Sequence, residues 1–222
     1  MKLAIYGSGG IGQEVSELVD EINKVHSLWS EVHIVDDNSS KTEVNIRNYE
    51  EFLKFINDKE EIYFVIAVGE PSTRELLFEK VKRDGFKLAV LVHPNSFISK
   101  QAKLGEGVVI CFGSFVSHHV TLNENVYIQP NVVVGHDSFI DRHTIVSPGA
   151  SIGGSVTIGN TTFVGLNASI KEKINIGSNA IVGMGCSLNI HVESDTIVTG
   201  NPAKIIGKNR FKKVFNVNTN EI

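Results

Sequence analysis

The sequence is poor in several features that would assign a function class on their own. It has only two cysteines, Cys111 and Cys186, which do not make a disulfide framework, so a reducing cytoplasmic setting is the expectation. It has no apolar run of membrane length and no signal-peptide pattern after Met1, so we expect neither membrane insertion nor secretion. Its 21 Lys and Arg are outnumbered by 25 Asp and Glu, and this balance does not favour nucleic acid as a partner.

What the sequence does contain is a six-residue repeat between Val92 and Val192. Each repeat is led by a branched aliphatic residue, and a small or β-branched residue usually follows four positions later. The leading residues are Val92, Ile98, Leu104, Ile110, Val116, Leu122, Ile128, Val134, Ile140, Val146, Ile152, Ile158, Val164, Ile170, Ile176, Val182 and Leu188. A fixed period of this kind is typical of a solenoid, whose coils bury apolar faces on one another. Because an unbroken strand has period two, the chain must turn within each repeat.

This repeat resembles the hexapeptide-repeat left-handed β-helix of the acyltransferases. In that fold three repeats form one triangular coil of eighteen residues, so residues eighteen apart occupy the same place on successive coils. The resemblance implies that residues 92–193 form a left-handed parallel β-helix. We expect an α/β domain before it, over residues 1–91, and a C-terminal cap or tail after it, over residues 194–222.

The first ninety residues alternate between strand and helix patterns. Strands are expected at 2–6, 31–35, 61–68 and 86–92, and helices at 13–25, 48–57 and 71–84. This βαβαβαβ alternation predicts a small parallel sheet. Four strands make half of a Rossmann-like dinucleotide fold, not a whole one.

The segment Gly7-Ser8-Gly9-Gly10-Ile11-Gly12 fits G-x-G-x-x-G between the first strand and the first helix. Glycines there let the backbone approach a phosphate, and the helix N-terminus supplies N–H donors, although a tight structural turn would have the same sequence. An acidic residue at the end of the second strand, Asp36 or Asp37, fits contact with a ribose or base. Because the chain continues into the six-residue repeat and has no second mononucleotide-binding half, hydride transfer is a poor interpretation of this motif. The ligand is either a nicotinamide cofactor or a nucleotide-activated substrate.

Histidines are the next feature of the repeat. His118, His136 and Gly154 are eighteen residues apart, so a glycine with no side chain follows His136 on the next coil. Its N–H could donate to a carbonyl or oxyanion. Asp137 lies beside His136, where it can orient the imidazole. His118 and His119 are more ordinary corner or interface residues, and a solvated corner is one reading of His143. The γ-class carbonic anhydrases use this β-helix for a zinc site with two histidines five residues apart. No histidine pair in the repeat has that spacing, so no metal site is expected.

Taken together, the motifs resemble the NeuD/PglD type of sugar acetyltransferase, which comprises sialic acid O-acetyltransferases and nucleotide-amino-sugar N-acetyltransferases. The resemblance covers nearly the whole chain. It is carried by Gly7 to Gly12, Asp36-Asp37, Val68-Gly69, Gly135-His136-Asp137, Ser147-Pro148-Gly149-Ala150, Gly165-Leu166-Asn167 and Gly200-Asn201-Pro202-Ala203-Lys204.

The resemblance implies roles for individual residues. His136 is the general base, Asp137 strengthens it in a position where many relatives have Glu, and the amide of Gly154 binds the thioester carbonyl of acetyl-CoA. The other expected acetyl-CoA contacts are Ile145, where some relatives have His, and Gly165, Gly183 and Lys204. The expected contacts to the nucleotide sugar are Gly9, Gly10, Ile11, Asp36, Asp37, Asn38 and Gly69, with Gln129 and Asn131 near the sugar.

The expected activity is direct acetyl transfer from acetyl-CoA to a UDP- or dTDP-linked 4-amino-deoxy sugar in polysaccharide or glycan biosynthesis. The family also implies a homotrimer with active sites between subunits. Two alternatives stay open at this point. One is O-acetylation of sialic acid or another sugar hydroxyl, and the other is a sugar-nucleotide-binding protein without enzymatic activity.

Overall fold

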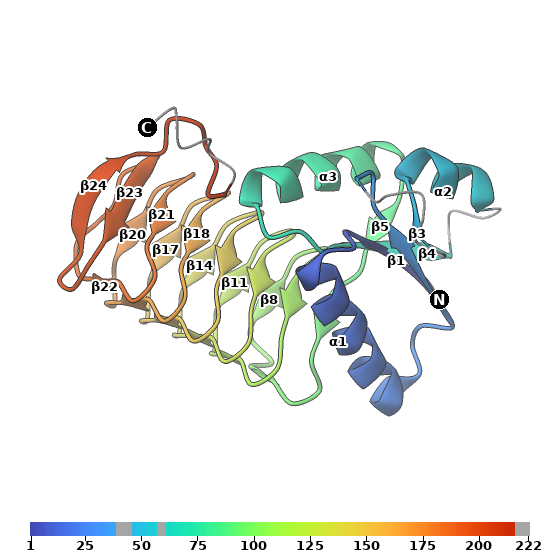
Figure 1. Ribbon diagram of the computed structural model, residues 1–222. Helices are drawn as coiled ribbons and strands as arrows, with labels where there is room; N and C mark the ends of the chain where they lie inside the picture. Colours follow the sequence, from blue (N-terminus) through green and yellow to red (C-terminus); the bar gives the residue numbers. More distant parts are fainter. Residues whose placement is uncertain (39–45, 57–60, 216–222) are drawn as a thin grey trace.

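The computed structural model describes residues 1–38, 46–56 and 61–215. They form an N-terminal α/β unit that packs on one side of a long triangular prism of stacked coils (Figure 1). The expected tail residues 216–222 and the expected helix residue Asn57 lie outside the described residues. None of the described helices is both long and apolar enough to cross a membrane.

The N-terminal unit is built on a five-stranded parallel sheet in the order β3-β2-β1-β4-β5. Its strands are β1 (Lys2–Tyr6), β2 (Glu31–Val35), β3 (Ile46–Arg47), β4 (Ile62–Ile66) and β5 (Lys87–Leu88). The edge strand β3 was not expected, because a two-residue strand is too short to show alternation. Helices cover both faces of this sheet, which explains why β1 and β4 are almost continuously apolar.

The helices are α1 (Gly10–His26), α2 (Tyr49–Phe55) and α3 (Pro71–Arg83). The first begins at Gly10 and not at residue 13, because the glycine-rich turn itself enters the helix and glycine gives no helical signal. The second begins after Asn48, whose side chain accepts a hydrogen bond from the Glu51 amide in a capping box. The third carries proline in its first turn, as predicted.

The prism is a left-handed parallel β-helix, and every strand of its six-residue repeat is two residues long. The strands are β6 (Leu91–Val92), β7 (Phe97–Ile98), β8 (Lys103–Leu104), β9 (Val109–Ile110), β10 (Phe115–Val116), β11 (Thr121–Leu122), β12 (Tyr127–Ile128), β13 (Val133–Val134), β14 (Phe139–Ile140), β15 (Ile145–Val146), β16 (Ser151–Ile152), β17 (Thr157–Ile158), β18 (Phe163–Val164), β19 (Ser169–Ile170), β20 (Asn175–Ile176), β21 (Ile181–Val182) and β22 (Ser187–Leu188). The expected strand 86–92 is therefore wrong as a single element: its first part pairs with β4 and its last part with β9.

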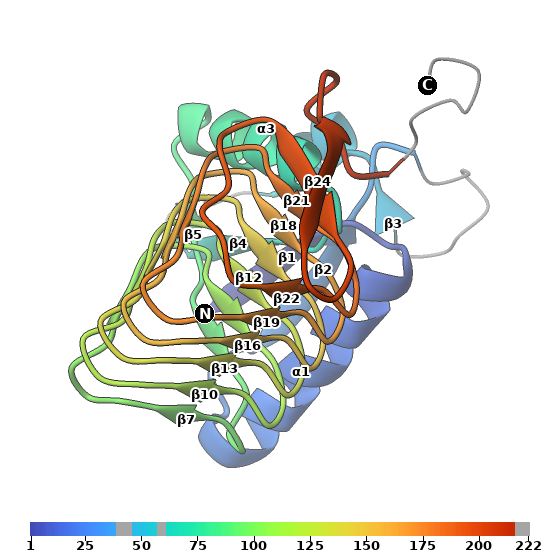
Figure 2. The ribbon, with the colours of Figure 1, turned by 90° about the vertical axis from the view of Figure 1, so that its left-hand side faces the viewer.

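The strands stack into three faces. Face 1 contains β6, β9, β12, β15, β18 and β21, face 2 contains β7, β10, β13, β16, β19 and β22, and face 3 contains β8, β11, β14, β17 and β20. Figure 2 shows face 2 as a row of parallel rungs. The chain passes from face 1 to face 2 to face 3 and back, so each coil has three corners, which we call corners 1–2, 2–3 and 3–1.

The leading residue of each repeat points into the prism, and most of them are completely buried. At the corners, the residue three positions after each leading residue from Leu104 to Val182 has a positive φ, as at Asn131 (58°), Asp137 (57°) and His143 (59°). Asn, Asp and His tolerate this left-handed conformation better than most side chains do. The corners can therefore carry chemically useful residues at positions where many repeats have glycine.

Beyond the coils, β23 (Thr196–Thr199) and β24 (Lys204–Lys208) form an antiparallel pair that extends face 1. The chain then returns along the prism. The amides of Val214 and Phe215 donate to the carboxylate of Glu70 at the start of α3, at 3.0 and 2.8 Å.

The N-terminal unit packs on face 1. Outward side chains of that face, including Tyr127 and Ile145, share a core with Val15 and Leu18 of α1. At corner 3–1, Arg74 of α3 is completely buried and donates to both the backbone oxygen and Oδ1 of Asn125, at 2.9 and 2.7 Å. The N-terminal unit thus lies against face 1 and corner 3–1, and corner 2–3 is the corner opposite face 1.

Candidate active site

Corner 2–3 brings together the three residues expected at the centre of catalysis. The Nδ1 atom of His136 lies 2.7 Å from Oδ2 of Asp137, and both side chains are about half exposed. A Cβ atom added at Gly154 would lie only 2.7 Å from Nε2 of His136. The imidazole therefore lies directly over a glycine, with Nδ1 held by a carboxylate and Nε2 without a hydrogen-bond partner among the described residues.

Asp137 serves a second imidazole as well. Its Oδ1 atom lies 3.2 Å from Nδ1 of His119, which belongs to the previous coil. Hydrogen bonds from His136 and then from His119 lower the pKa of the Asp137 carboxyl, so it is ionised at neutral pH. The His118 ring stacks on the His136 ring at a centroid separation of 5.5 Å. Asp137 thus orients His136 while its backbone amide, bonded to the His118 oxygen at 3.1 Å, fixes the corner.

Gly154 has the geometry of a hydrogen-bond donor to a ligand. Its carbonyl accepts from the Lys173 amide, whereas among the described residues its own N–H has no hydrogen-bond acceptor. A free backbone N–H next to a base can bind a carbonyl oxygen on which negative charge develops.

A cavity of about 560 Å³ lies at the carboxyl ends of β1, β2 and β4. Every residue expected to hold the nucleotide lines it: Gly9, Gly10, Ile11, Asp36, Asp37, Asn38 and Gly69. Helix α1 starts here with no side-chain cap and no acidic residue in its first turn, so unpaired amides point into the cavity. This arrangement suits a phosphate group.

The two aspartates of this cavity are already engaged within the chain. Asp36 accepts hydrogen bonds from the Ser8 amide at 2.8 Å, the Ser8 hydroxyl at 2.7 Å and the Asn38 amide at 2.8 Å. Burial opposes ionisation of this carboxyl, but these hydrogen bonds outweigh it and lower its pKa. Asp37 accepts from the Tyr6 hydroxyl and from Lys80. Both aspartates therefore brace the loops that line the cavity, and a ligand would share them.

The remaining expected residues lie on face 1 or at corner 1–2, away from His136. Gln129 and Asn131 are at corner 1–2, and Gly165 and Gly183 occupy the same edge on later coils. Lys204 is exposed on β24. The Ile145 side chain is 1% exposed in the core beneath α1, and its amide donates to Thr162, so the expected contact with acetyl-CoA has no free side-chain surface in this chain.

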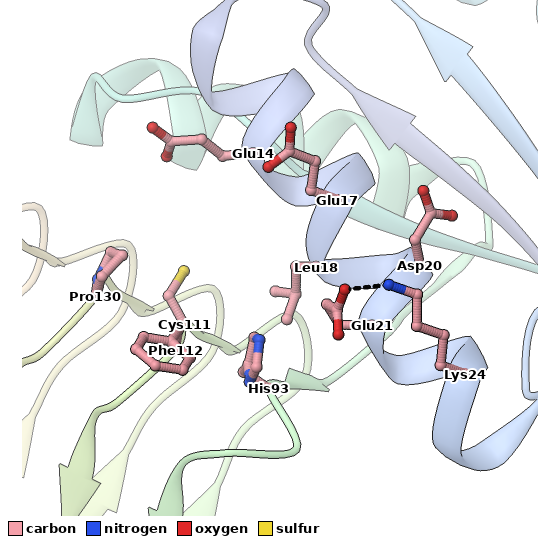
Figure 3. Close-up of a pocket in the computed structure, with 10 residues that line it drawn as sticks. All are labelled: Glu14, Glu17, Leu18, Asp20, Glu21, Lys24, His93, Cys111, Phe112 and Pro130. Atoms are coloured by element: carbon pink, nitrogen blue, oxygen red, sulfur yellow. Dashed lines mark hydrogen bonds and ion pairs between the residues drawn. The ribbon is translucent and has the colours of Figure 1, made fainter.

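A second cavity of about 480 Å³ lies between α1 and corner 1–2 (Figure 3). Four carboxylates and one ammonium line its helical wall: Glu14, Glu17, Asp20, Glu21 and Lys24. The opposite wall includes Phe112 and Pro130, and Pro130 lies between Gln129 and Asn131. Cys111 also lines this cavity, but burial raises the pKa of its thiol to about 11, so it is not a thiolate nucleophile at neutral pH.

Sequence reasoning missed the residues that join the two parts of the chain. Arg74 and Asn125 gave no signal, because a buried arginine on an amphipathic helix looks like any exposed one. His143 is not a solvated corner: it is 2% exposed, bonded to the Asn125 amide at 3.0 Å and packed on Phe78. The acidic side of α1 was visible in the sequence as Glu14, Glu17 and Glu21 but had no expected partner.

Comparison with known proteins agrees with this arrangement. Residues 2–81 match the family model of the PglD N-terminal domain, and residues 86–185 match that of the GMPPB C-terminal domain. UDP-N-acetylbacillosamine N-acetyltransferase of Bacillus subtilis (strain 168) is 30% identical over 112 residues, or 49% of this chain and 50% of that protein. The matched region thus spans about half the length of this curated relative.

Solved structures match along nearly the whole chain. The acetyltransferase domain of PglB from Neisseria gonorrhoeae FA1090, in complex with acetyl coenzyme A, has a TM-score of 0.85 and 29% identity, covering 92% of this chain and 98% of that one. PerB from Caulobacter crescentus, in complex with CoA and GDP-perosamine, has a TM-score of 0.84 and 25% identity, covering 93% and 98%.

The chain thus shares its fold, a half-Rossmann-like unit packed on a hexapeptide-repeat β-helix, with these solved structures. Residues 2–81 match the PglD N-terminal domain, and along nearly its whole length the chain is similar to the acetyltransferase domain of PglB.

Proposed function

We propose that this chain transfers the acetyl group of acetyl-CoA to the amine of a nucleotide-linked 4-amino-deoxy sugar, with His136 as the general base. The observation that carries the proposal is the corner in which His136 is bonded to Asp137 on one side and lies over Gly154 on the other. In this proposal residues 1–91 bind the nucleotide, residues 92–193 carry the catalytic corner, and residues 194–222 cap the prism.

The chemistry is one direct transfer. The neutral amine of the sugar attacks the thioester carbon, so that an N–C bond forms and the C–S bond breaks. The free Nε2 of His136 takes the proton that the nitrogen must lose and passes it to the departing thiolate of CoA. The Gly154 N–H donates to the thioester oxygen as charge develops on it. Asp137 keeps the imidazole in the orientation, and its Nδ1 in the protonated state, that this step needs.

The nucleotide would bind in the cavity at the ends of β1, β2 and β4, with its phosphates at the N-terminus of α1. Ile11 in that cavity and Glu14 in the acidic cavity are three residues apart on the helix, so they are neighbours on its surface. A sugar attached to the phosphates can extend into the acidic cavity. The four carboxylates there attract an amino sugar, which is cationic before it reacts, and repel the carboxylate of sialic acid. This charge favours the N-acetyl reaction over the O-acetyl one.

The topology supports a reaction between copies of the chain. The N-terminal unit packs on face 1, and His136 is at the opposite corner. A nucleotide sugar held by one chain therefore lies on the far side of the prism from its own His136. The same separation divides Gly154 from Gly165, Gly183 and Lys204, so acetyl-CoA would touch both sets only if it bound between two subunits. We propose a homotrimer with three such sites.

The test measures CoA release with a thiol reagent. The panel contains UDP-, dTDP- and GDP-linked 4-amino sugars and free sialic acid. We expect turnover on one amino sugar, and a loss of about 10²- to 10⁴-fold in kcat for His136→Asn with an unchanged circular dichroism spectrum. The exposed His26, at the end of α1, supplies the matched control His26→Asn. Turnover on sialic acid alone would assign O-acetylation, and tight nucleotide-sugar binding without CoA release would assign a binding protein.

A further inference from the structure

Corner 2–3 gathers more metal-binding groups than the acetyl transfer uses. One ligand atom each from His118, His119 and Asp137 lies within 4.8 Å of the other two. The His119 Nδ1 atom is 3.2 Å from Asp137 Oδ1, and the His118 and His119 rings meet edge to face at 5.3 Å. All three side chains are exposed in the single chain, so an ion can reach them there directly from solvent.

The backbone holds these groups in position before any ligand binds. His119 and Asp137 both have a φ of 57°, and they occupy the same corner position on successive coils. The Asp137 amide donates to the His118 oxygen at 3.1 Å, which ties the two corners together. Only the side-chain torsions of His118, His119 and Asp137 remain free, and rotation about them can bring the three ligand atoms around one ion.

The donor set selects the kind of ion. Two imidazole nitrogens and one carboxylate oxygen suit Zn²⁺, Ni²⁺ or Cu²⁺, whereas Mg²⁺ and Ca²⁺ prefer oxygen ligands only. Zinc binds such atoms at about 2.0–2.2 Å in a tetrahedron, so its ligands lie roughly 3.4 Å from one another. Movements of about 1 Å in side chains that are half exposed bring the three atoms to that spacing.

We propose that His118, His119 and Asp137 form a site for a divalent transition-metal ion such as Zn²⁺, and that an ion there withdraws Asp137 from His136. The carboxylate that would bind the metal is the same one whose Oδ2 lies 2.7 Å from His136 Nδ1. Binding of the ion is independent of the proposed function, whereas the loss of activity on binding rests on it. The site is inhibitory, and it competes with the base for one carboxylate.

The first test is titration of the full chain with ZnCl₂ in a buffer that does not chelate metal, followed by calorimetry. We expect one Zn²⁺ per chain, and at least a tenfold weaker affinity in His118→Asn and in His119→Asn. Asparagine accepts a positive φ, so His119→Asn keeps the corner conformation. His26→Asn is the matched control and keeps the affinity of the unaltered chain. Unchanged affinity in both corner variants, or no binding below millimolar Zn²⁺, overturns the proposal.

The second test is the visible spectrum of bound Co²⁺, which reports the ligands without any need for turnover. His136→Asn should leave the Co²⁺ spectrum in place, and its loss there would assign the site to His136 and overturn the ligand set. In the acetyl-transfer assay, Zn²⁺ should inhibit the unaltered chain and His26→Asn at least tenfold more strongly than His119→Asn, each measured against its own metal-free rate. If the chain transfers no acetyl group but the calorimetry behaves as expected, the metal site stands and only the proposed function fails.

Discussion

Arg74 is tied to Asn125 by hydrogen bonds that join a helix of the N-terminal unit to a corner of the β-helix. The guanidinium is completely buried, and among the described residues it meets no carboxylate. It donates instead to the oxygens of Asn125, Ile66 and Val68. Burial lowers the pKa of Arg74 to about 10, which still leaves it charged at neutral pH. Backbone carbonyls thus solvate a buried cation at the seam between the two parts of the chain.

Replacing Arg74 by Met should destabilise the fold strongly. Methionine fills similar space but leaves buried carbonyl oxygens without donors, at about 1–3 kcal/mol for each group. We expect the free energy of unfolding, measured with urea, to fall by roughly 2–4 kcal/mol. Arg83→Met, at an exposed position of the same helix, is the matched control and should change it by less than about 0.5 kcal/mol. Equal losses in the two variants would show that the seam contributes nothing.

His143 should make stability depend on pH. Burial, and then the charges of Arg74 and Arg142, lower its pKa to about 4 from the usual 6.5. Between these pH values the unfolded chain binds a proton that the folded chain does not. The stabilisation that neutral His143 gives the fold is therefore complete above pH 6.5 and is lost as the pH falls toward 4. The free energy of unfolding should fall by about 2 kcal/mol between pH 7 and pH 5 from this group.

The variant His143→Asn tests this dependence, because asparagine tolerates the positive φ of the corner and does not titrate. The difference in unfolding free energy between pH 7 and pH 5 should shrink by about 2 kcal/mol relative to the unaltered chain. His26→Asn should leave that difference as it is. If His143→Asn left the pH dependence unchanged, His143 would bind its proton as readily in the folded chain as in the unfolded chain, and the lowered pKa would be wrong.

Gly154→Ala should damage activity more than stability. The added Cβ would meet the Nε2, Cε1 and Cδ2 atoms of His136, at 2.7 to 3.2 Å, and no backbone atom is among the three nearest. The exposed imidazole can swing away at little cost to folding but then leaves its catalytic position. We expect kcat to fall by about 10²-fold or more, with the unfolding free energy changed by less than about 1 kcal/mol. Gly207→Ala, where a Cβ meets nothing within 4 Å, controls for the loss of a glycine.

Asp36→Ala should weaken binding of the nucleotide sugar. The carboxylate holds Ser8 in the glycine-rich turn and Asn38 in the loop after β2, and both loops line the cavity. We expect KM for the sugar nucleotide to rise at least tenfold, while KM for acetyl-CoA, which binds elsewhere, stays within twofold. Asp36→Asn keeps an acceptor for the Asn38 amide, so its KM for the sugar nucleotide should lie between those of the unaltered chain and Asp36→Ala. A rise in both KM values would indicate general unfolding instead.

The sequence predicted the β-helix well because its signal repeats. Each leading residue from Val92 to Leu188 ends a two-residue strand, and one register serves the whole prism. The stacking of His136 on His118, and of Gly154 on His136, followed from the same period. The signal failed where elements were short or used once: β3 has two residues, and the strand expected at 86–92 is divided between two sheets.

The cavity proposed for the nucleotide was also predictable, since Gly9, Asp36 and Gly69 follow neighbouring parallel strands whose ends meet at one edge. The contact of His119 with Asp137 could have been found, because they are eighteen residues apart and share a corner. The contact of Arg74 with Asn125 could not have been predicted from the sequence. Arg74 and Asn125 are joined by the angle at which the N-terminal unit meets face 1, and no local pattern encodes that angle.

The coils pair only with the coils immediately before and after them. A gain or loss of eighteen residues would therefore insert or remove one complete coil and keep every pairing beyond it. A gain of one residue would move each later leading residue out of the interior to a corner, and a loss of one residue would move it to the outward strand position. The β-helix can therefore change in length without loss of pairing only by whole coils of eighteen residues, and such a change elsewhere in the prism would leave the corner that holds His136 intact.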